Sequence, residues 1–155
     1  MEPMRRANKE VKELEELHAI IRKARVLHLG LCDDGAPYVV PLNFGFDGEF
    51  IYFHCAHEGR KLDILSRNNR VCATLVADDE IVPAPRACKW TSRFRCVMAF
   101  GRAEVAADAR EKLHALETIM AHYSSERHNF DPRDVDRVTI VKITIERING
   151  KKSGW

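Results

Sequence analysis

The sequence predicts a mainly β protein, an antiparallel barrel with a few helices at its ends. Segments rich in β-branched and aromatic residues recur along the chain, and several alternate apolar with small or polar residues. Tight-turn signals at Asp33-Asp34-Gly35 and Phe46-Asp47-Gly48-Glu49 join neighbouring segments, which favours antiparallel pairing. Helical patterns are few. The expected strands cover residues 25–32, 36–46, 49–54, 70–77, 94–106 and 137–148.

Length and composition indicate one globular domain over residues 1–155. Hydrophobic residues make up 45% and charged residues 31%, which is the balance of a globular protein with a core. The net charge of +2 is too small to predict a nucleic-acid partner. No apolar run approaches the roughly 20 residues that cross a membrane, and the amino terminus lacks a signal-like apolar stretch. We therefore expect a cytoplasmic protein whose five cysteines are reduced thiols, mostly buried in strands.

Three helices are expected from apolar spacing. Residues 8–24 carry an amphipathic pattern, and residues 58–68 carry a shorter one. The third helix follows Asp108, which forms a variant of the capping box with Glu111. Its apolar stripe comprises Leu113, Leu116, Ile119, Met120 and Tyr123. Gly101, inside the long strand before this helix, predicts a bulge or bend.

The segment 36–46 has two different faces. One face, predicted to lie in the core, comprises Tyr38, Val40, Leu42, Phe44 and Phe46. The other is small and nearly uncharged, so a flat group could lie against it. Pro41 cannot donate a ladder hydrogen bond, which places this strand at an edge or beside a break in pairing. Backbone groups beside such a break are free to bind a ligand.

The segment 53–65, FHCAHEGRKLDIL, allows three kinds of site. A metal site would use His54 and His57, but a structural zinc site needs four ligands and no second Cys/His pair follows at ligand spacing. A nucleophilic site would pair Cys55 with His54, yet adjacent residues on a strand point to opposite faces. We therefore predict no metal, and Cys55 is most simply a small strand residue.

Phosphate binding fits this segment best. A strand ends at His54, Gly59 allows a turn, and a helix begins near Arg60 and Lys61. Helix N-termini offer free backbone N–H groups and the positive end of the dipole. Arg60 can add a bidentate contact and Lys61 a point charge. A basic pair on a helix is by itself commonly just solvated.

The blocks PYVVPLNF, IYFHCAHEGRKLDIL, CKWTSRFRCVMAFGRAEV and IERINGKKS together resemble the pyridoxamine 5'-phosphate oxidase-like flavin-binding proteins. Within them, the chain is most similar to the branch named for 5-nitroimidazole resistance. The resemblance implies a six-stranded antiparallel Greek-key split barrel that binds FMN at a homodimer interface. Cys55 departs from the serine or threonine common in the family, which removes a hydroxyl contact to the cofactor.

The resemblance also implies roles for particular residues. Val40, Pro41, Leu42 and Asn43 would line the isoalloxazine ring, with His54 and Cys55 near it and Arg60 and Lys61 on the phosphate. Trp90, Thr91, Ser92 and Arg95 would approach the flavin from the partner subunit. Trp90 could equally fill an interface, and Arg95 could pair with a surface carboxylate.

The main functional hypothesis is an FMN-dependent oxidoreductase that passes electrons to a small aromatic or nitro-aromatic acceptor. His54 is the best candidate for proton transfer, because the pKa of histidine is ordinarily near neutrality. Pyridoxamine-phosphate oxidation is not expected, since the extra basic residues for a second phosphate are missing. Two alternatives stay open: a flavin-binding or sensing module without turnover, and a haem-binding barrel with His54 or His57 as axial ligand.

Overall fold

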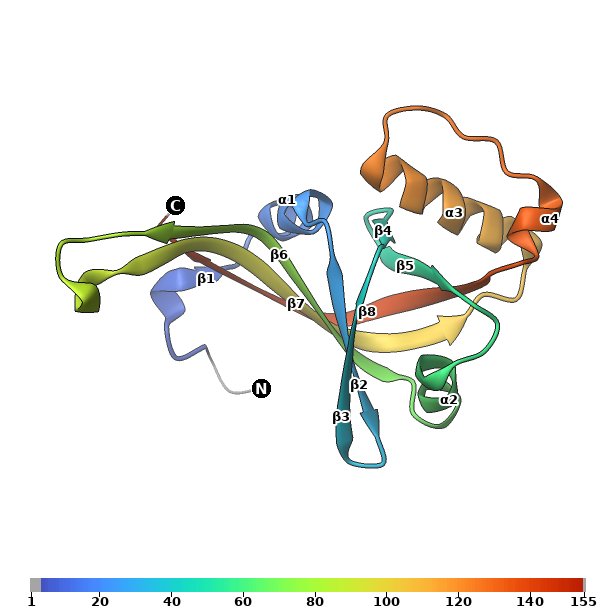
Figure 1. The fold of residues 1–155 in the computed structure, drawn as a ribbon, viewed down its shortest axis with the longest axis horizontal. Coiled ribbons are helices and arrows are strands. Elements are labelled where there is room, and N and C mark those ends of the chain that lie inside the picture. Colours follow the sequence, from blue (N-terminus) through green and yellow to red (C-terminus); the bar gives the residue numbers. More distant parts are fainter. Residues whose placement is uncertain (1–3, 155) are drawn as a thin grey trace.

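The computed structural model describes residues 4–154, which form one antiparallel sheet curled into a barrel with an extended arm (Figure 1). The strand order is β3-β2-β6-β7-β8-β5-β4. The six long strands are β2 (Leu27–Asp33), β3 (Ala36–Leu42), β5 (Phe50–Cys55), β6 (Arg70–Val82), β7 (Thr91–Val105) and β8 (Thr139–Ser153). Two short ones, β1 (Glu10–Val11) and β4 (Gly45–Phe46), pair with β8 and β5. The predicted mainly β fold is confirmed.

The two ends of the strand order, β3 and β4, are consecutive in the sequence, so a short connection draws the open edges of the sheet toward each other. Only Asn43 and Phe44 separate β3 from β4. Phe44 is fully buried, and its N–H donates to the Tyr123 hydroxyl at 3.1 Å. Edge strand β3 contributes only partly buried side chains to the interior. The fully buried aliphatic and aromatic side chains come from the other long strands and include Leu27, Leu29, Ile51, Phe53, Ala73, Leu75, Val97, Val141 and Ile143.

The helices cover the ends and one outer face of this barrel. They are α1 (Leu14–Lys23), α2 (Arg60–Arg67), α3 (Ala109–Tyr123) and α4 (Pro132–Val135), with 3₁₀ turns at Ala7–Lys9 and Ala87–Lys89. A second apolar cluster joins α3 and α4 to the outer side of β5 and β8 through Tyr52, Leu116, Ile119 and Ile140. No helix among the described residues is long and apolar enough to span a membrane.

The helix predicted over residues 8–24 begins only at Leu14. Val11 instead lies in β1, opposite Gly150 of β8. Gly150 leaves the room for this pairing, since a Cβ there would lie 2.8 Å from the Cβ of Val11. The prediction was wrong because a tertiary strand pairing outcompeted a local helical pattern. Leu14, the first residue of the helix, is 55% exposed.

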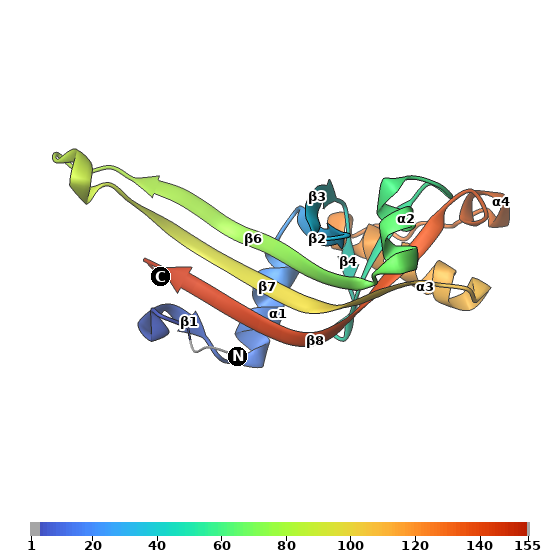
Figure 2. The ribbon, with the colours of Figure 1, turned by 90° about the horizontal axis from the view of Figure 1, so that it is seen from below.

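The strands predicted over residues 70–77 and 94–106 extend further than expected and form an arm. β6 and β7 stay paired past the barrel as far as Val82 and Thr91, and both views show the arm leaving the body of the molecule (Figures 1 and 2). The sequence predicts strand only as far as residue 77 and again from residue 94. The predicted bulge at Gly101 is confirmed, because the β7–β8 register shifts between Phe100 and Gly101.

The cysteines form no disulfide within the described residues, as expected for reduced thiols. Cys55 is buried, and Cys72 and Cys96 are half-buried. Cys32 and Cys88 are exposed, so the expectation that most cysteines lie buried in strands holds only in part. Cys32 projects from the outer side of β2, and Cys88 lies near the tip of the arm.

Candidate functional site

The start of α2 forms an uncapped helix N-terminus. Gly59 occupies the N-cap position with φ of +135°, a conformation that favours glycine, and no side chain caps the helix. Leu62 and Asp63 donate their N–H groups back to the Gly59 carbonyl. The N–H groups that precede these two in the first turn can donate hydrogen bonds to an anion. The helix predicted at residues 58–68 therefore begins at Arg60, where its first-turn N–H groups could contact a phosphate.

Arg60 connects this helix to the β2–β3 hairpin. Its Cζ lies 4.8 Å from the centre of the Tyr38 ring in β3, and its Nη2 lies 3.5 Å from Asp33 Oδ2. Two parts of the predicted site, residues 60–61 and strand β3, are therefore neighbours in space. Sequence reasoning missed both partners of Arg60, because nothing in the order of residues pairs a turn aspartate with a helix 27 positions away.

Strand β3 lies at the edge of the sheet, as Pro41 predicted. It pairs with β2 alone among the described strands. Val40 and Leu42 pack against the barrel core, whereas Pro41 and Asn43 are exposed. The outward face predicted to be small is only partly open, because α3 covers Gly45 so closely that a Cβ there would meet the Thr118 carbonyl.

The outer side of β3 continues into a shallow hollow of about 410 Å³ across the sheet. Gly30, Cys72 and Phe100 stand in register at its floor, and Pro37 and Val39 border it from β3. The Arg147 guanidinium lies over the Phe100 ring, 4.0 Å from its centre. This hollow therefore lies next to the residues predicted to line the flavin ring. The β3 residues at its border are Pro37 and Val39, and residues 40–43 do not line it.

Cys55 and His54 lie on opposite sides of β5. The Cys55 side chain is buried in the barrel core. Burial raises the pKa of its thiol, and the nearby Lys61 ammonium offsets this only in part. The thiol is therefore protonated near neutral pH, which disfavours the nucleophilic hypothesis. His54 is exposed and stands opposite Ile140, on the outer face that carries Tyr52.

His57 has both ring nitrogens engaged. Nε2 donates to the Asp136 carbonyl at 2.8 Å, so Nδ1 accepts from the Thr139 hydroxyl at 3.0 Å. The ring thereby pins the loop after β5 to the start of β8. This role accounts for the residue without a metal or a haem.

Trp90, Thr91 and Ser92 lie near the tip of the arm, far from α2 within one chain (Figures 1 and 2). The Trp90 indole is 56% exposed and its N–H donates to the Ala84 carbonyl at 2.9 Å. At the base of the arm, Arg95 donates to Asp78 at 2.7 Å, and Arg95 is the main cause of the lowered pKa of Asp78. A single chain therefore does not bring this block to Arg60 and β3.

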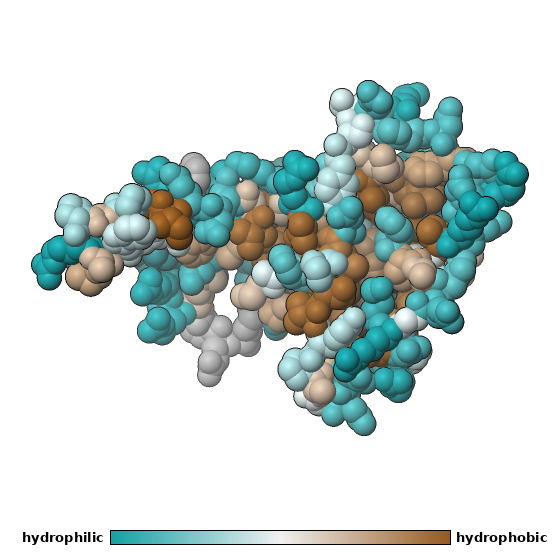
Figure 3. All heavy atoms as spheres, viewed as in Figure 1, coloured by the Kyte–Doolittle hydropathy of each residue, from teal (hydrophilic) through white to brown (hydrophobic). Residues whose placement is uncertain are grey.

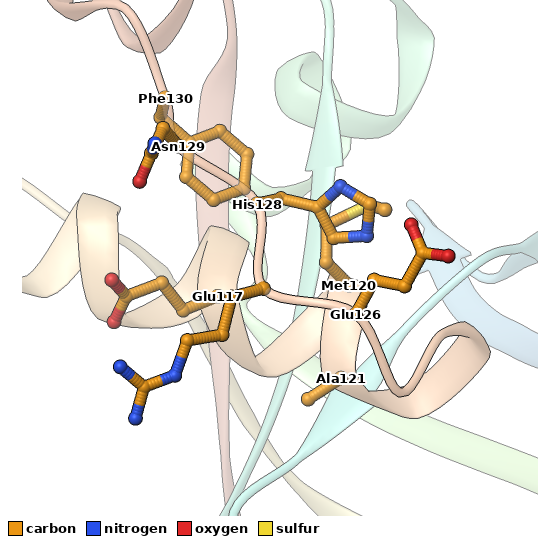
Figure 4. A pocket seen from close by; sticks show the side chains of 8 residues that line it. Glu117, Met120, Ala121, Glu126, His128, Asn129 and Phe130 are labelled. Atoms are coloured by element: carbon orange, nitrogen blue, oxygen red, sulfur yellow. The ribbon is translucent and has the colours of Figure 1, made fainter.

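A separate hollow of about 490 Å³ lies between α3 and the loop that follows it (Figure 4). The Phe130 ring, Met120 and His128 line it together with exposed charged side chains. None of the predicted site residues belongs to it. It therefore adds nothing to the site at β3 and α2.

Comparison with known proteins identifies the family of this chain. The family model described as pyridoxamine 5'-phosphate oxidase matches residues 13–152, nearly the whole chain. The chain belongs to this family. None of the curated proteins compared with it gives a match. The family resemblance inferred from the sequence is thereby confirmed.

Among solved structures, a candidate 5-nitroimidazole antibiotic resistance protein from Bacteroides thetaiotaomicron is 33% identical, with a TM-score of 0.83 over 92% of this chain and 86% of that one. The flavocytochrome Anf3 from Azotobacter vinelandii (23% identity, TM-score 0.85) covers 99% of this chain and 73% of its own. An FAD-binding protein from Mesorhizobium loti is 21% identical, with a TM-score of 0.69 over 94% of this chain and 98% of that one. The last two show the shared fold.

Proposed function

We propose that this protein is an FMN-binding flavoprotein that acts as a homodimer and reduces small aromatic or nitro-aromatic acceptors. The observation that carries the proposal is the contact of Arg60 with Tyr38, which sets the uncapped start of α2 beside edge strand β3. FMN needs both features: a cationic cradle for its phosphate and a strand with free backbone groups beside an apolar surface.

The residues present fit this cofactor. Arg60, Lys61 and the first-turn N–H groups of α2 would hold the phosphate. Backbone groups of residues 40–43 would contact the ring system, since β3 has one side free of a strand partner. Bound flavin would supply the redox chemistry. Cys55 contributes a small buried side chain at the end of β5.

His54 is the proposed proton-transfer residue. It is exposed on the outer side of β5, one residue before the strand ends. An imidazole can hold a proton near neutral pH and release it to an acceptor that takes up electrons.

A homodimer would account for the position of the arm. The tip of the arm, which carries Trp90, Thr91 and Ser92, lies far from α2 of its own chain, so a partner chain would have to bring this block to the flavin. The strands of the sheet and arm expose apolar side chains, among them Val39, Val76, Ile81 and Met98. Figure 3 shows apolar surface along the middle of the molecule and on the arm. A second copy would bury such surface.

The family supports this proposal, as does the relative linked to nitroimidazole resistance. A haem-binding barrel is a second candidate, because the Azotobacter relative is a flavocytochrome and a second neighbour, from Mycobacterium smegmatis, binds FAD and haem. In this chain His54 would be the axial ligand, because the nitrogens of His57 are taken. The absorption spectrum of the purified protein separates the two: flavin bands support our proposal, and a Soret band contradicts it.

The phosphate assignment is tested by Arg60→Ala combined with Lys61→Ala. Losing two charge-assisted contacts should weaken FMN binding by about 100-fold or more, measured by quenching of flavin fluorescence. The matched control is Arg110→Ala with Lys112→Ala, a basic pair in the first turn of α3, which should leave affinity unchanged. Unchanged FMN affinity in the α2 variant would show that the phosphate lies elsewhere.

Turnover is tested separately from binding. Reduced, FMN-loaded protein should be reoxidised by nitro-aromatic compounds or quinones under anaerobic conditions. If it binds FMN but stays inert to the whole panel, the protein is a flavin-binding or sensing module.

A further inference from the structure

Asp33 borders the proposed phosphate cradle from the β2–β3 turn and contacts two arginines of α2. Its Oδ1 accepts from Arg67 Nη2 at 2.7 Å, and its Oδ2 lies 3.5 Å from Arg60 Nη2. Arg60 and Arg67 are seven positions apart, so they share one face of the helix. Asn68, just past the helix, also donates to the Cys32 carbonyl at 3.3 Å. The turn is thereby fixed along one side of α2.

The two contacts differ in strength, and this difference decides which cation is available. At 2.7 Å, Arg67 makes a full charge-assisted hydrogen bond, whereas the Arg60 contact is longer than such bonds usually are. The Arg60 and Arg67 side chains are equally exposed, at 61% and 62%, so the contact with Asp33 is what distinguishes them. An incoming phosphate can therefore recruit Arg60 at small cost, while Arg67 stays neutralised by Asp33.

The charges around the cradle suffice for one phosphate. Arg60 and Lys61 supply two positive charges at the helix start, which match a dianionic monoester. The flanking positions are acidic: Asp34 is exposed in the turn, and Glu58 is exposed just before Gly59. A second phosphate beyond the first would meet carboxylates, and the nearby Arg67 is already paired.

We propose that Asp33 is a specificity-determining residue that restricts this site to a flavin with one terminal phosphate and disfavours the dinucleotide. The inference rests on the proposed function and names the form of flavin that the site selects. Asp33 acts in two ways: it repels additional negative charge, and it keeps Arg67 from serving as a second phosphate ligand.

The test compares riboflavin, FMN and FAD by fluorescence titration of the apoprotein. The wild-type protein should bind FMN at least about tenfold more tightly than FAD, and Asp33→Asn should narrow that ratio by about tenfold. The affinity of Asp33→Asn for riboflavin should stay within about twofold of the wild-type affinity, because riboflavin has no phosphate. Glu117→Gln, which removes an exposed carboxylate on α3, is the matched control and should change nothing.

Asp34→Asn provides a second variant that leaves the Asp33 contacts in place, should Asp33→Asn destabilise the turn. Asp34→Asn should narrow the ratio of FMN affinity to FAD affinity by a smaller factor, about threefold. Equal wild-type affinity for FMN and FAD, or an unchanged ratio in both variants, would overturn the role of Asp33 while leaving FMN binding established. A wild-type protein that binds none of the three flavins would overturn the proposed function as well.

Discussion

Gly101 lies where β7 crosses β8 too closely for any side chain. A Cβ at this position would lie 1.9 Å from the Thr144 carbonyl oxygen, and a backbone atom cannot move aside as a side chain can. The register shift between Phe100 and Gly101 occurs at the same place. The bulge therefore depends on the absence of one methyl group.

Gly101→Ala should lower the free energy of unfolding by about 3 kcal/mol, because the β7–β8 ladder must shift to admit the methyl group. Urea denaturation measures the loss. Gly35→Ala is the control: its φ is +87° but nothing lies within 4 Å of its Cβ position, so it should cost only about 1 kcal/mol. Similar losses in both variants would mean that backbone conformation matters here and close packing does not.

For single residues, the sequence indicated what a residue type does locally more readily than which residues it contacts. Gly101 inside a strand pattern indicated the bulge, and Arg60 with Lys61 at a helix start indicated an anion site. Asp33 and Tyr38 could not be assigned to that site, since the contact depends on how the β2–β3 hairpin lies against α2.

Among the elements, α3 illustrates a helix whose ends and packing are specified differently. Its start follows from Asp108, whose carboxylate accepts from the Glu111 N–H at 3.1 Å, as the capping signal predicted. Its last residue, Tyr123, donates to the Arg25 carbonyl and accepts from the Phe44 N–H, which ties the helix across the closure of the barrel. Of the predicted stripe, Leu116 and Ile119 are buried, while Leu113 and Tyr123 are partly exposed.

Asp108→Ala should destabilise the protein by about 1 kcal/mol, the usual cost of losing an N-cap side chain. Asp108→Asn keeps an oxygen acceptor at the same position and should cost little. Thermal unfolding of the two variants beside the wild type measures the difference. Equal destabilisation by alanine and asparagine would contradict the capping role and point to the negative charge instead.

In the folded molecule, the tip of the β6–β7 arm and the α2 cradle lie on opposite sides (Figure 2). Under the proposed function, each flavin site would use the cradle of one chain and the arm of the other. This arrangement predicts that defects in the two halves of the site complement each other between subunits.

Chains carrying Arg60→Ala with Lys61→Ala should recover FMN binding when co-expressed with chains carrying Trp90→Ala with Arg95→Ala. Random pairing places one intact site in each mixed dimer, so about a quarter of wild-type flavin content is expected. Each variant expressed alone is the control, and light scattering gives the size of the assembly. No recovery in dimers shown to be mixed would contradict a shared site.

The sequence by itself determined the local features: the strand pattern, the hairpin turns, the capped α3, the edge position of β3 and the uncapped basic start of α2. These follow from residue periodicity and backbone preference, which act over a few neighbouring positions. Only the tertiary structure decided that residues 10–11 pair with β8 instead of extending a helix, that the arm is long, and that Asp33 lies beside Arg60. Such contacts join residues far apart in the chain, and packing between distant elements sets them.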